Sequence, residues 1–553
     1  MKMIKSMWAS AFLLMALLCS LAAANVDKDD AATEDIFLYK AIPGDSLWNI
    51  AQRHLHSIKL WTELKKINHL TNDDYIEPGT LIKVPRAWLK TNQSTATLVN
   101  AIGSVTIIND NEQTLQYGQD FTDKDSLILT TGDKIITGDD GLATILFKDG
   151  SRLLLQSNSE LVLKDLIALG DGSLSDIKLE LEKGRLENRV YSSPISNTNY
   201  EVKTASAMTS VRGTVFRMGL EKDDNSVTEV VTGKVVAKSA EEAAQGAELT
   251  AGEAIIITKE GDAKKVAMLP PPEFKSFPQL IEAVPIRIDV PKADNVMGYA
   301  TKVVPVGEDE QDAVSSLRSQ GDVLLGGDLP DGRYRMIVSA IDDNGVTGQP
   351  ASYEFILNAR PFAPNLTTPD NHAKALLKDL TFAWQKVNDE AKTYYLQVAR
   401  DADFREVIID ADNLSVPEYQ PKDLLSGVYY WRVASIADNG KRGPFSSVMD
   451  TRVLLEDPNL DHAHVKTANV MLEWAPLERG TQYLIQVSND PSFKQVLLEH
   501  SLPETELFIE DLVPGTYYFR IQSTAFDGYV SEWGLPQSFE VLNIPSISAK
   551  LTP

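Results

Sequence analysis

The stretch PGDSLWNIA at residues 43–51 decides how the first part of this chain is interpreted. It follows an alternating run, FLYKAI at residues 37–42, which predicts a short strand. The proline, glycine and aspartate end that strand, and Ser46 is of a residue type that caps helices. Leu47 and Ile50 then fall on one face of the helix that begins there.

A second helix and a closing strand complete the same unit, at residues 35–86. Apolar residues at positions 60, 61, 64 and 67 predict the second helix, and Asn68 is a suitable helix end. A Pro-Gly turn at residues 78–79 leads into TLIKVP at residues 80–85, which predicts the second strand. So small a unit should be only marginally stable by itself.

These residues resemble the LysM family, from Tyr39 through Pro85. The resemblance implies a βααβ fold that binds N-acetylglucosamine-containing glycans, which in bacteria means peptidoglycan. It implies a groove between the first strand–helix loop and the loop before the last strand. Carried onto this chain, the glycan-binding residues are Gly44, Asp45, Ser46, Leu47, Tyr75, Ile76 and Pro78.

The physical chemistry of two such loops is compatible with this groove. Backbone N–H and C=O groups would face the acetamido groups, and Leu47 and Ile76 would offer apolar patches to the methyl groups. A single shallow site should bind weakly, so stronger retention would require multivalency. The alternative is that Gly44, Leu47 and Pro78 only shape the turns and the core.

Residues 96–260 alternate short apolar runs with turn signals, which predicts an all-β domain. This segment resembles a FecR-type domain, most specifically in SVRGTVF at residues 210–216. We interpret its recurring glycines as tight turns that need a positive φ. The regulator that names the family relays a periplasmic signal through a transmembrane helix. No such helix is expected here, so that role is not carried over.

A proline-rich connector at residues 267–280 predicts an extended spacer, and three related units follow it. Aligning Gly332, Gly427 and Gly515, each at the start of a tyrosine-containing strand, gives offsets of 95 and 88 residues. This period predicts immunoglobulin-like β-sandwiches, and the units resemble fibronectin type III modules. The three units are assigned to residues 281–360, which is the most divergent, 361–455 and 456–545.

Aromatic residues recur at the same repeat period in the last two units. They are Trp384, Trp474, Tyr430 and Tyr518. They could form a sugar-stacking platform, but their recurrence favours packing in the core.

Residues 1–24 predict an export signal, with a basic start, an apolar run at residues 7–21 and small residues before the cleavage point. The run is too short to suggest an uncleaved membrane anchor. Cys19, the single cysteine, lies inside it, and Leu18 before it fits a lipoprotein signal badly. The mature chain would then lack thiols, which excludes disulfides and cysteine nucleophiles. No later segment is expected to cross a membrane.

The net charge of -25 makes nucleic acid a poor partner. We find no catalytic motif and no phosphate-binding loop. His54 with His56, and His462 with His464, are spaced like ligands but have no evident third ligand. We therefore expect no enzyme activity, no cofactor and no metal site.

The multidomain, mainly β chain is thus expected to be a non-catalytic peptidoglycan-binding protein of the cell envelope, exported to the periplasm or the cell wall. Its β-domains would act as a scaffold or contact another envelope protein. Two alternatives stay open. One is a periplasmic sensor or regulator of envelope signalling that acts through the FecR-like domain. The other is a cryptic peptidoglycan hydrolase.

Overall fold

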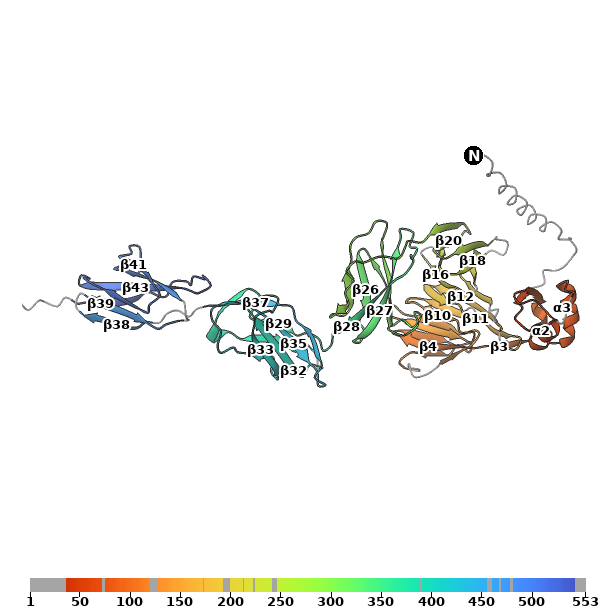
Figure 1. Cartoon of the computed structure of the whole chain (residues 1–553), viewed down its shortest axis with the longest axis horizontal. Helices are drawn as coiled ribbons and strands as arrows, with labels where there is room; N and C mark the ends of the chain where they lie inside the picture. The colour runs from red at the N-terminus through yellow and green to blue at the C-terminus, as the bar shows by residue number, and fades with distance from the viewer. Residues whose placement is uncertain are drawn as a thin grey trace, which may run out of the picture. The chain divides into compact units, whose positions relative to one another are not determined.

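The structure is a computed structural model of the chain (Figure 1). It describes residues 36–71, 75–119, 127–172, 174–191, 199–211, 213–221, 224–240, 246–387, 390–454, 460–466, 469–477 and 481–542. The export signal expected at residues 1–24 and Arg212 of the 210–216 motif lie outside these residues. Within the described part of the chain, no helix combines the length and apolar character that crossing a bilayer requires.

The fold is mainly β, as expected, and divides into two compact units. The first comprises the chain up to Phe277 together with Arg287–Gly327 and Arg335–Tyr353. The second comprises Pro278–Ile286, Asp328–Tyr334 and Glu354–Pro553. The division passes through the first of the three predicted sandwich modules.

The N-terminal domain has the predicted order of strand, helix, helix, strand. Its elements are β1 (Ile36–Lys40), α2 (Leu47–His54), η1 (Ile58–Leu60), α3 (Trp61–Ile67), β2 (Leu81–Pro85) and η2 (Arg86–Trp88). Strands β1 and β2 pair antiparallel, with Tyr39 opposite Ile82. Alternation in β1 buries Phe37 and Tyr39 against α2, so the pattern that predicted the strand also forms the core.

The second domain is a sandwich of two large sheets. Its strands are β3 (Thr91–Gln93), β4 (Ala96–Ile102), β5 (Val105–Ile108), β6 (Thr114–Gln116), β7 (Leu127–Leu129), β8 (Lys134–Thr137), β9 (Leu142–Phe147), β10 (Arg152–Leu155), β11 (Glu160–Leu169), β12 (Leu174–Lys183), β13 (Arg185–Arg189), β14 (Asn199–Lys203), β15 (Ala207–Val211), β16 (Val215–Leu220), β17 (Ser226–Thr232), β18 (Lys234–Ser239), β19 (Ala247–Thr250), β20 (Glu253–Ile257) and β21 (Ala263–Ala267). One sheet has the order β21-β20-β17-β16-β13-β10-β9-β4-β7. The other has the order β19-β18-β15-β14-β12-β11-β8-β5-β6, with β3 added beside β11.

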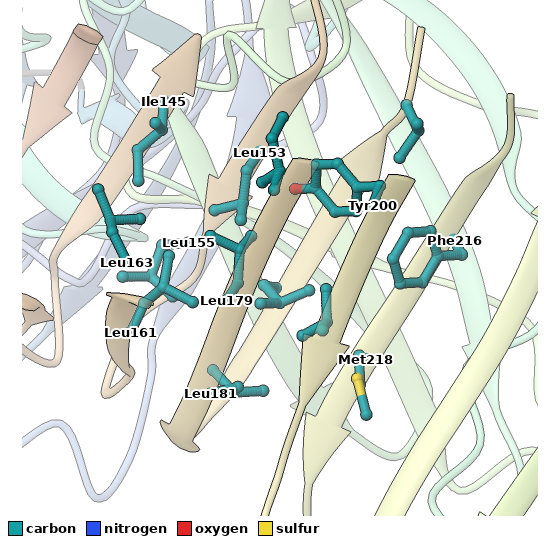
Figure 2. Packing of buried hydrophobic residues seen from close by; sticks show 14 of the residues in the cluster. Ile145, Leu153, Leu155, Leu161, Leu163, Leu179, Leu181, Tyr200, Phe216 and Met218 are labelled. Carbon is teal, nitrogen blue, oxygen red and sulfur yellow. The ribbon is translucent and has the colours of Figure 1, made fainter. Parts of the chain in front are cut away.

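Side chains from both sheets fill the space between them. Figure 2 shows Leu153 and Phe216 of the first sheet with Leu163, Leu179 and Tyr200 of the second. The glycines interpreted as tight turns do have a positive φ, which confirms that interpretation. They are Gly132, Gly150, Gly184, Gly213, Gly233 and Gly252.

The first sandwich module packs on the outer face of the second domain. Its strands are β22 (Leu280–Ile281), β23 (Ile286–Asp289), β24 (Gly298–Pro305), β25 (Ser315–Gln320), β26 (Val323–Gly327), β27 (Gly332–Ile341) and β28 (Ala351–Leu357). Leu142 and Leu154 of β9 and β10 share a buried cluster with Val304. Arg152 forms an ion pair of 2.6 Å with Asp312. This contact buries a sheet face that alternation alone would leave in solvent.

The proline-rich connector is attached to the same module rather than extended into solvent. The backbone N–H of Phe274 donates to the hydroxyl of Tyr353 at 3.1 Å, and that hydroxyl donates to Pro272 O at 2.6 Å. The ring of Phe277 stacks on Tyr353 with centroids 4.6 Å apart. These contacts fix the connector along the module.

Two further sandwiches form most of the second unit. One contains β29 (Asn365–Thr368), β30 (Ala373–Leu376), η4 (Leu377–Asp379), β31 (Phe382–Gln385), β32 (Thr393–Ala399), β33 (Val407–Leu414), β34 (Glu418–Tyr419), β35 (Gly427–Ile436), β36 (Arg442–Phe445) and β37 (Met449–Leu454). The other contains β38 (Leu460–Lys466), β39 (Asn469–Trp474), β40 (Gln482–Ser488), β41 (Leu498–Leu502), β42 (Glu506–Ile509), β43 (Gly515–Thr524) and β44 (Gln537–Val541).

A recurring tyrosine confirms that the three modules share one design. Tyr334, Tyr429 and Tyr517 each donate from the hydroxyl to the backbone oxygen four residues upstream, at 2.9, 3.0 and 2.8 Å. This is the tyrosine corner of immunoglobulin-like sandwiches.

The expected core aromatics divide into two groups. Trp384 and Trp474 are each 3% exposed and lie in their module cores, as expected. Tyr430 and Tyr518 are only partly buried, so the expectation is wrong for these two. Along each strand the preceding tyrosine faces the core instead, because neighbouring residues alternate between the two faces.

Candidate functional site

The first candidate loop is built around a capped helix. Residues 41–46 leave β1, and the backbone N–H of Asn49 donates to Ser46 Oγ at 3.1 Å. Ser46 therefore satisfies a donor that the first helical turn cannot pair. Gly44 has a φ of +89°, which favours glycine, and an added Cβ would meet no heavy atom within 4 Å. The loop thus presents open backbone at Gly44.

Asp45 holds this loop in place. Its side chain is 1% exposed, and it accepts from the Tyr39 hydroxyl and the Ile42 backbone N–H, each at 2.8 Å. Arg53 of α2 pairs with its other oxygen. Burial, followed by the hydrogen bond to Asp45, raises the pKa of Tyr39, so the tyrosine remains a donor. The carboxylate is occupied by these contacts, and Asp45 is therefore a positioning residue.

A backbone hydrogen bond joins the second candidate loop to the first. The N–H of Ile76 donates to Asp45 O at 3.1 Å. Gly79 N donates to Ala41 O at 2.8 Å, which fixes the other end of the loop beside the end of β1. The structure therefore brings the two sequence-predicted loops together.

The seven predicted residues differ in what they present. Gly44, Tyr75 and Pro78 are exposed, and Ser46 is partly exposed while serving as the cap. Leu47 is 0% exposed and Ile76 is 3% exposed. Their side chains belong to the core, so the expectation that they form apolar patches for methyl groups is wrong.

Trp48 is an aromatic candidate that the sequence interpretation passed over. It is 47% exposed and lies three residues after Asp45, while Tyr75, one residue before Ile76, is 58% exposed. The helical pattern contained this signal, because a residue between core-facing Leu47 and Ile50 points outward. Exposed aromatic rings beside polar backbone are suited to carbohydrate rings.

The domain is anchored at the opposite end of its sheet. Arg86, directly after β2, forms an ion pair of 2.6 Å with Asp176 of β12. Leu169 and Leu174, at the β11–β12 hairpin, are buried in the core of the N-terminal domain. Because β1 and β2 are antiparallel, this end carries Ile36 and Arg86, and the two candidate loops lie at the other end.

His54 lies in the same junction and is 2% exposed. A Cβ on Gly170 of the hairpin would lie 2.2 Å from His54 Nδ1, so only glycine fits there. Burial lowers the pKa of His54, and the ring is neutral at pH 7. His56 is exposed, and the described residues contain no group of three or more metal-binding side chains.

Two protein-family models match segments of this chain, and they agree with the resemblances inferred from the sequence. Residues 39–85 match the LysM domain. Residues 133–236 match the family described as FecR protein. Neither of these domain types, nor the fibronectin type III module, is a catalytic family. No curated protein matches this sequence.

Solved structures resemble parts of the chain at low identity. A candidate anti-sigma factor from Parabacteroides distasonis is 18% identical over 24% of this chain, with a TM-score of 0.20, and the chain spans 59% of its length. The FN1–FN3 domains of chicken CNTN1 are 16% identical over 45% of this chain and 89% of theirs, with a TM-score of 0.14. A two-domain fibronectin type III segment of chicken tenascin is 13% identical over 32% of this chain and 98% of its own, with a TM-score of 0.25.

Proposed function

We propose that this chain is a non-catalytic, extracytoplasmic protein that binds peptidoglycan through the two loops of its LysM domain. The observation that carries the proposal is the hydrogen bond from Ile76 N to Asp45 O. It joins the two loops while Gly44, Tyr75 and Pro78 stay exposed beside it. The ligand is an N-acetylglucosamine-containing glycan.

The contacts would differ from those inferred from the sequence. With Leu47 and Ile76 in the core, loop backbone groups would meet the acetamido groups, and the exposed rings of Trp48 and Tyr75 would cover apolar sugar faces. A single site of this kind predicts weak binding in solution and firmer retention on a polymeric sacculus.

The β-domains would serve as a scaffold or contact another envelope protein. The module boundaries inferred from the sequence are part of this proposal, as are the cleaved export signal and the periplasmic or wall-associated location. The FecR match at residues 133–236 favours a second function, in which this domain contacts a component of an envelope signalling system.

Cosedimentation of the exported chain with purified sacculi tests the binding function. Deleting residues 35–86 would also expose Leu169 and Leu174, so a point substitution is the cleaner probe. Gly44→Trp places a bulky group in the loop and should reduce the pelleted fraction.

Gly307→Trp is the matched control, because Gly307 has a φ of +103° and similarly open surroundings but lies in the first sandwich module. It should pellet like the native chain. If the native chain and Gly44→Trp pellet equally, the glycan site is not formed by these two loops. Release of soluble muropeptides would instead establish a hydrolase.

A further inference from the structure

The first sandwich module lacks a strand that the two later modules have. In the later modules, β31 and β39 each lie between two strands, with β29 or β38 on one side and β34 or β42 on the other. The corresponding strand of the first module is β23, which pairs with β26. Within the described residues, no strand lies on the other side of β23. One position of this small sheet is therefore open.

The proline-rich connector cannot fill that position as a strand. Pro270, Pro271 and Pro272 have no backbone N–H, so this stretch cannot donate hydrogen bonds to a neighbouring strand. The hydroxyl of Tyr353 holds the connector instead, through Pro272 O and Phe274 N. A groove of about 560 Å³ remains between the connector and β23.

This groove opens onto the apolar interior of the module. Its lining includes Tyr299 of β24 and Ala340 of β27, which are 1% and 3% exposed. Ile288 of β23 and Val290 directly after it also line the groove. Phe274 faces them from the connector, with its ring centroid 5.8 Å from that of Tyr299. An occupant would therefore meet several apolar side chains.

The open edge of β23 also offers backbone hydrogen-bonding groups. Val290 N donates to Asp322 O at 2.9 Å, on the side of β26. Backbone groups of successive strand residues point to opposite sides, so Arg287 and Asp289 direct theirs away from β26. The side chains of these two residues are 63% and 81% exposed. An extended chain beside β23 could pair with this edge as β29 pairs with β31.

We propose that this groove docks an extended peptide segment of another protein, which adds a strand beside β23. The later modules support this occupant, because the equivalent position in one of them holds β29, a strand of four residues beside the four residues of β31. β23 also has four residues. Apolar side chains at every second position of the peptide would enter the groove, while its backbone pairs with Arg287 and Asp289.

The inference rests on the contact with another envelope protein that is proposed for the β-domains, and it names the surface for that contact. The groove shares no residue with the LysM domain, so blocking it should leave binding to sacculi unchanged. Pro285 and Pro291 flank β23 on either side. They limit pairing to one short segment and oppose a continuous ladder of strands.

Random linear peptides displayed on phage, selected on the purified full chain, provide the probe. Enriched peptides should carry apolar residues at alternate positions, and a synthetic copy should slow hydrogen exchange at residues 286–290. Asp289→Pro removes one outward N–H at an edge that tolerates proline, and should weaken binding of the synthetic peptide by roughly tenfold or more. Asp289→Asn is the matched control, because it removes the same exposed charge but keeps the N–H, and it should bind like the native chain.

Val296→Lys is a second variant, since Val296 lines the groove from the loop before β24. It should also weaken peptide binding, and it decides alone if Asp289→Pro does not fold. Both variants should pellet with sacculi like the native chain, which separates failure of this groove from failure of the glycan site.

Three results would overturn the proposal. The first is that no peptide is enriched, or that the enriched peptides bind the native chain and both variants equally. The second is that a bound peptide slows exchange only outside residues 286–290. The third is a native chain that dimerises in analytical ultracentrifugation while Asp289→Pro stays monomeric, because a second copy would then be the occupant.

Discussion

Replacing Leu174 by alanine should loosen the LysM domain although this leucine belongs to the neighbouring domain. Leu174 is 0% exposed and is buried among the side chains of the LysM core. Buried leucine-to-alanine changes cost about 2.7–5 kcal/mol. A unit of about 50 residues has roughly 2.5–7.5 kcal/mol of stability in total. The substitution therefore removes a large share of what holds this domain folded.

Limited proteolysis of the full chain across a urea series, followed by mass spectrometry, measures this effect. In Leu174→Ala, cleavage within residues 36–90 should begin at clearly lower urea than in the native chain. Leu179→Ala is the control, since Leu179 lies on the same strand and is 1% exposed but packs in the FecR-like core. It should sensitise the FecR-like strands first. Unchanged cleavage of residues 36–90 in Leu174→Ala would refute the shared core.

Three further predictions concern the rest of the chain. Glu187 pairs with both Lys302 and Arg217, and Glu187→Gln removes the negative charge that these two cations share. Chemical denaturation should show a free energy of unfolding lower by about 3–5 kcal/mol. A loss below about 1 kcal/mol would show that these three side chains are not removed from water. The lowered pKa of His54 means that the unfolded chain takes up a proton first, so stability is full above the ordinary value of 6.5 and falls as the pH drops below it. Melting curves from about pH 7.5 to 5 should show this loss for the LysM domain, and His54→Leu should remove it. Trp474→Ala should lower the free energy of unfolding of the last sandwich by about 3–5 kcal/mol and leave the other modules unchanged. Proteolysis with the cleavage sites assigned to each module would show this. Simultaneous unfolding of all modules would contradict independent cores.

Local patterns in the sequence predicted the elements well where one face meets solvent. The 43–51 stretch gave the turn, the cap and the helix because each depends on neighbouring residues. The repeat near 90 residues gave the sandwiches, and its aligned glycines lie at the start of equivalent strands. The first inference needed only neighbouring residues and the helical period of 3.6 residues, and the second needed only the long repeat and the alternation within its strands.

Such local patterns could not predict the contacts between domains. In β13, Leu186 faces the core and Glu187 points the other way, which alternation assigns to solvent. The first sandwich covers that face, so Glu187 is buried. Likewise Leu169 and Leu174 look like ordinary strand residues of their own domain, and nothing local indicates that they complete another core.

The sequence predicted that the two candidate loops lie together, but not which of their side chains stay exposed. The two loops do meet, yet Leu47 and Ile76 point inward, because the helix and the short strand pairing need them as core. Trp48 lies between core-facing Leu47 and Ile50, so the helical period alone places its ring outward, where it is 47% exposed. Burial in so small a domain leaves few apolar side chains for a ligand.

Hydrogen–deuterium exchange of the full chain, with and without saturating chito-oligosaccharide, tests the central claim most directly. Slower exchange confined to residues 42–48 and 75–79 is the predicted result, because bound sugar would cover the backbone N–H groups of both loops. Exchange that is unchanged there, or protection found only in the FecR-like or sandwich domains, would contradict a glycan site in the LysM domain.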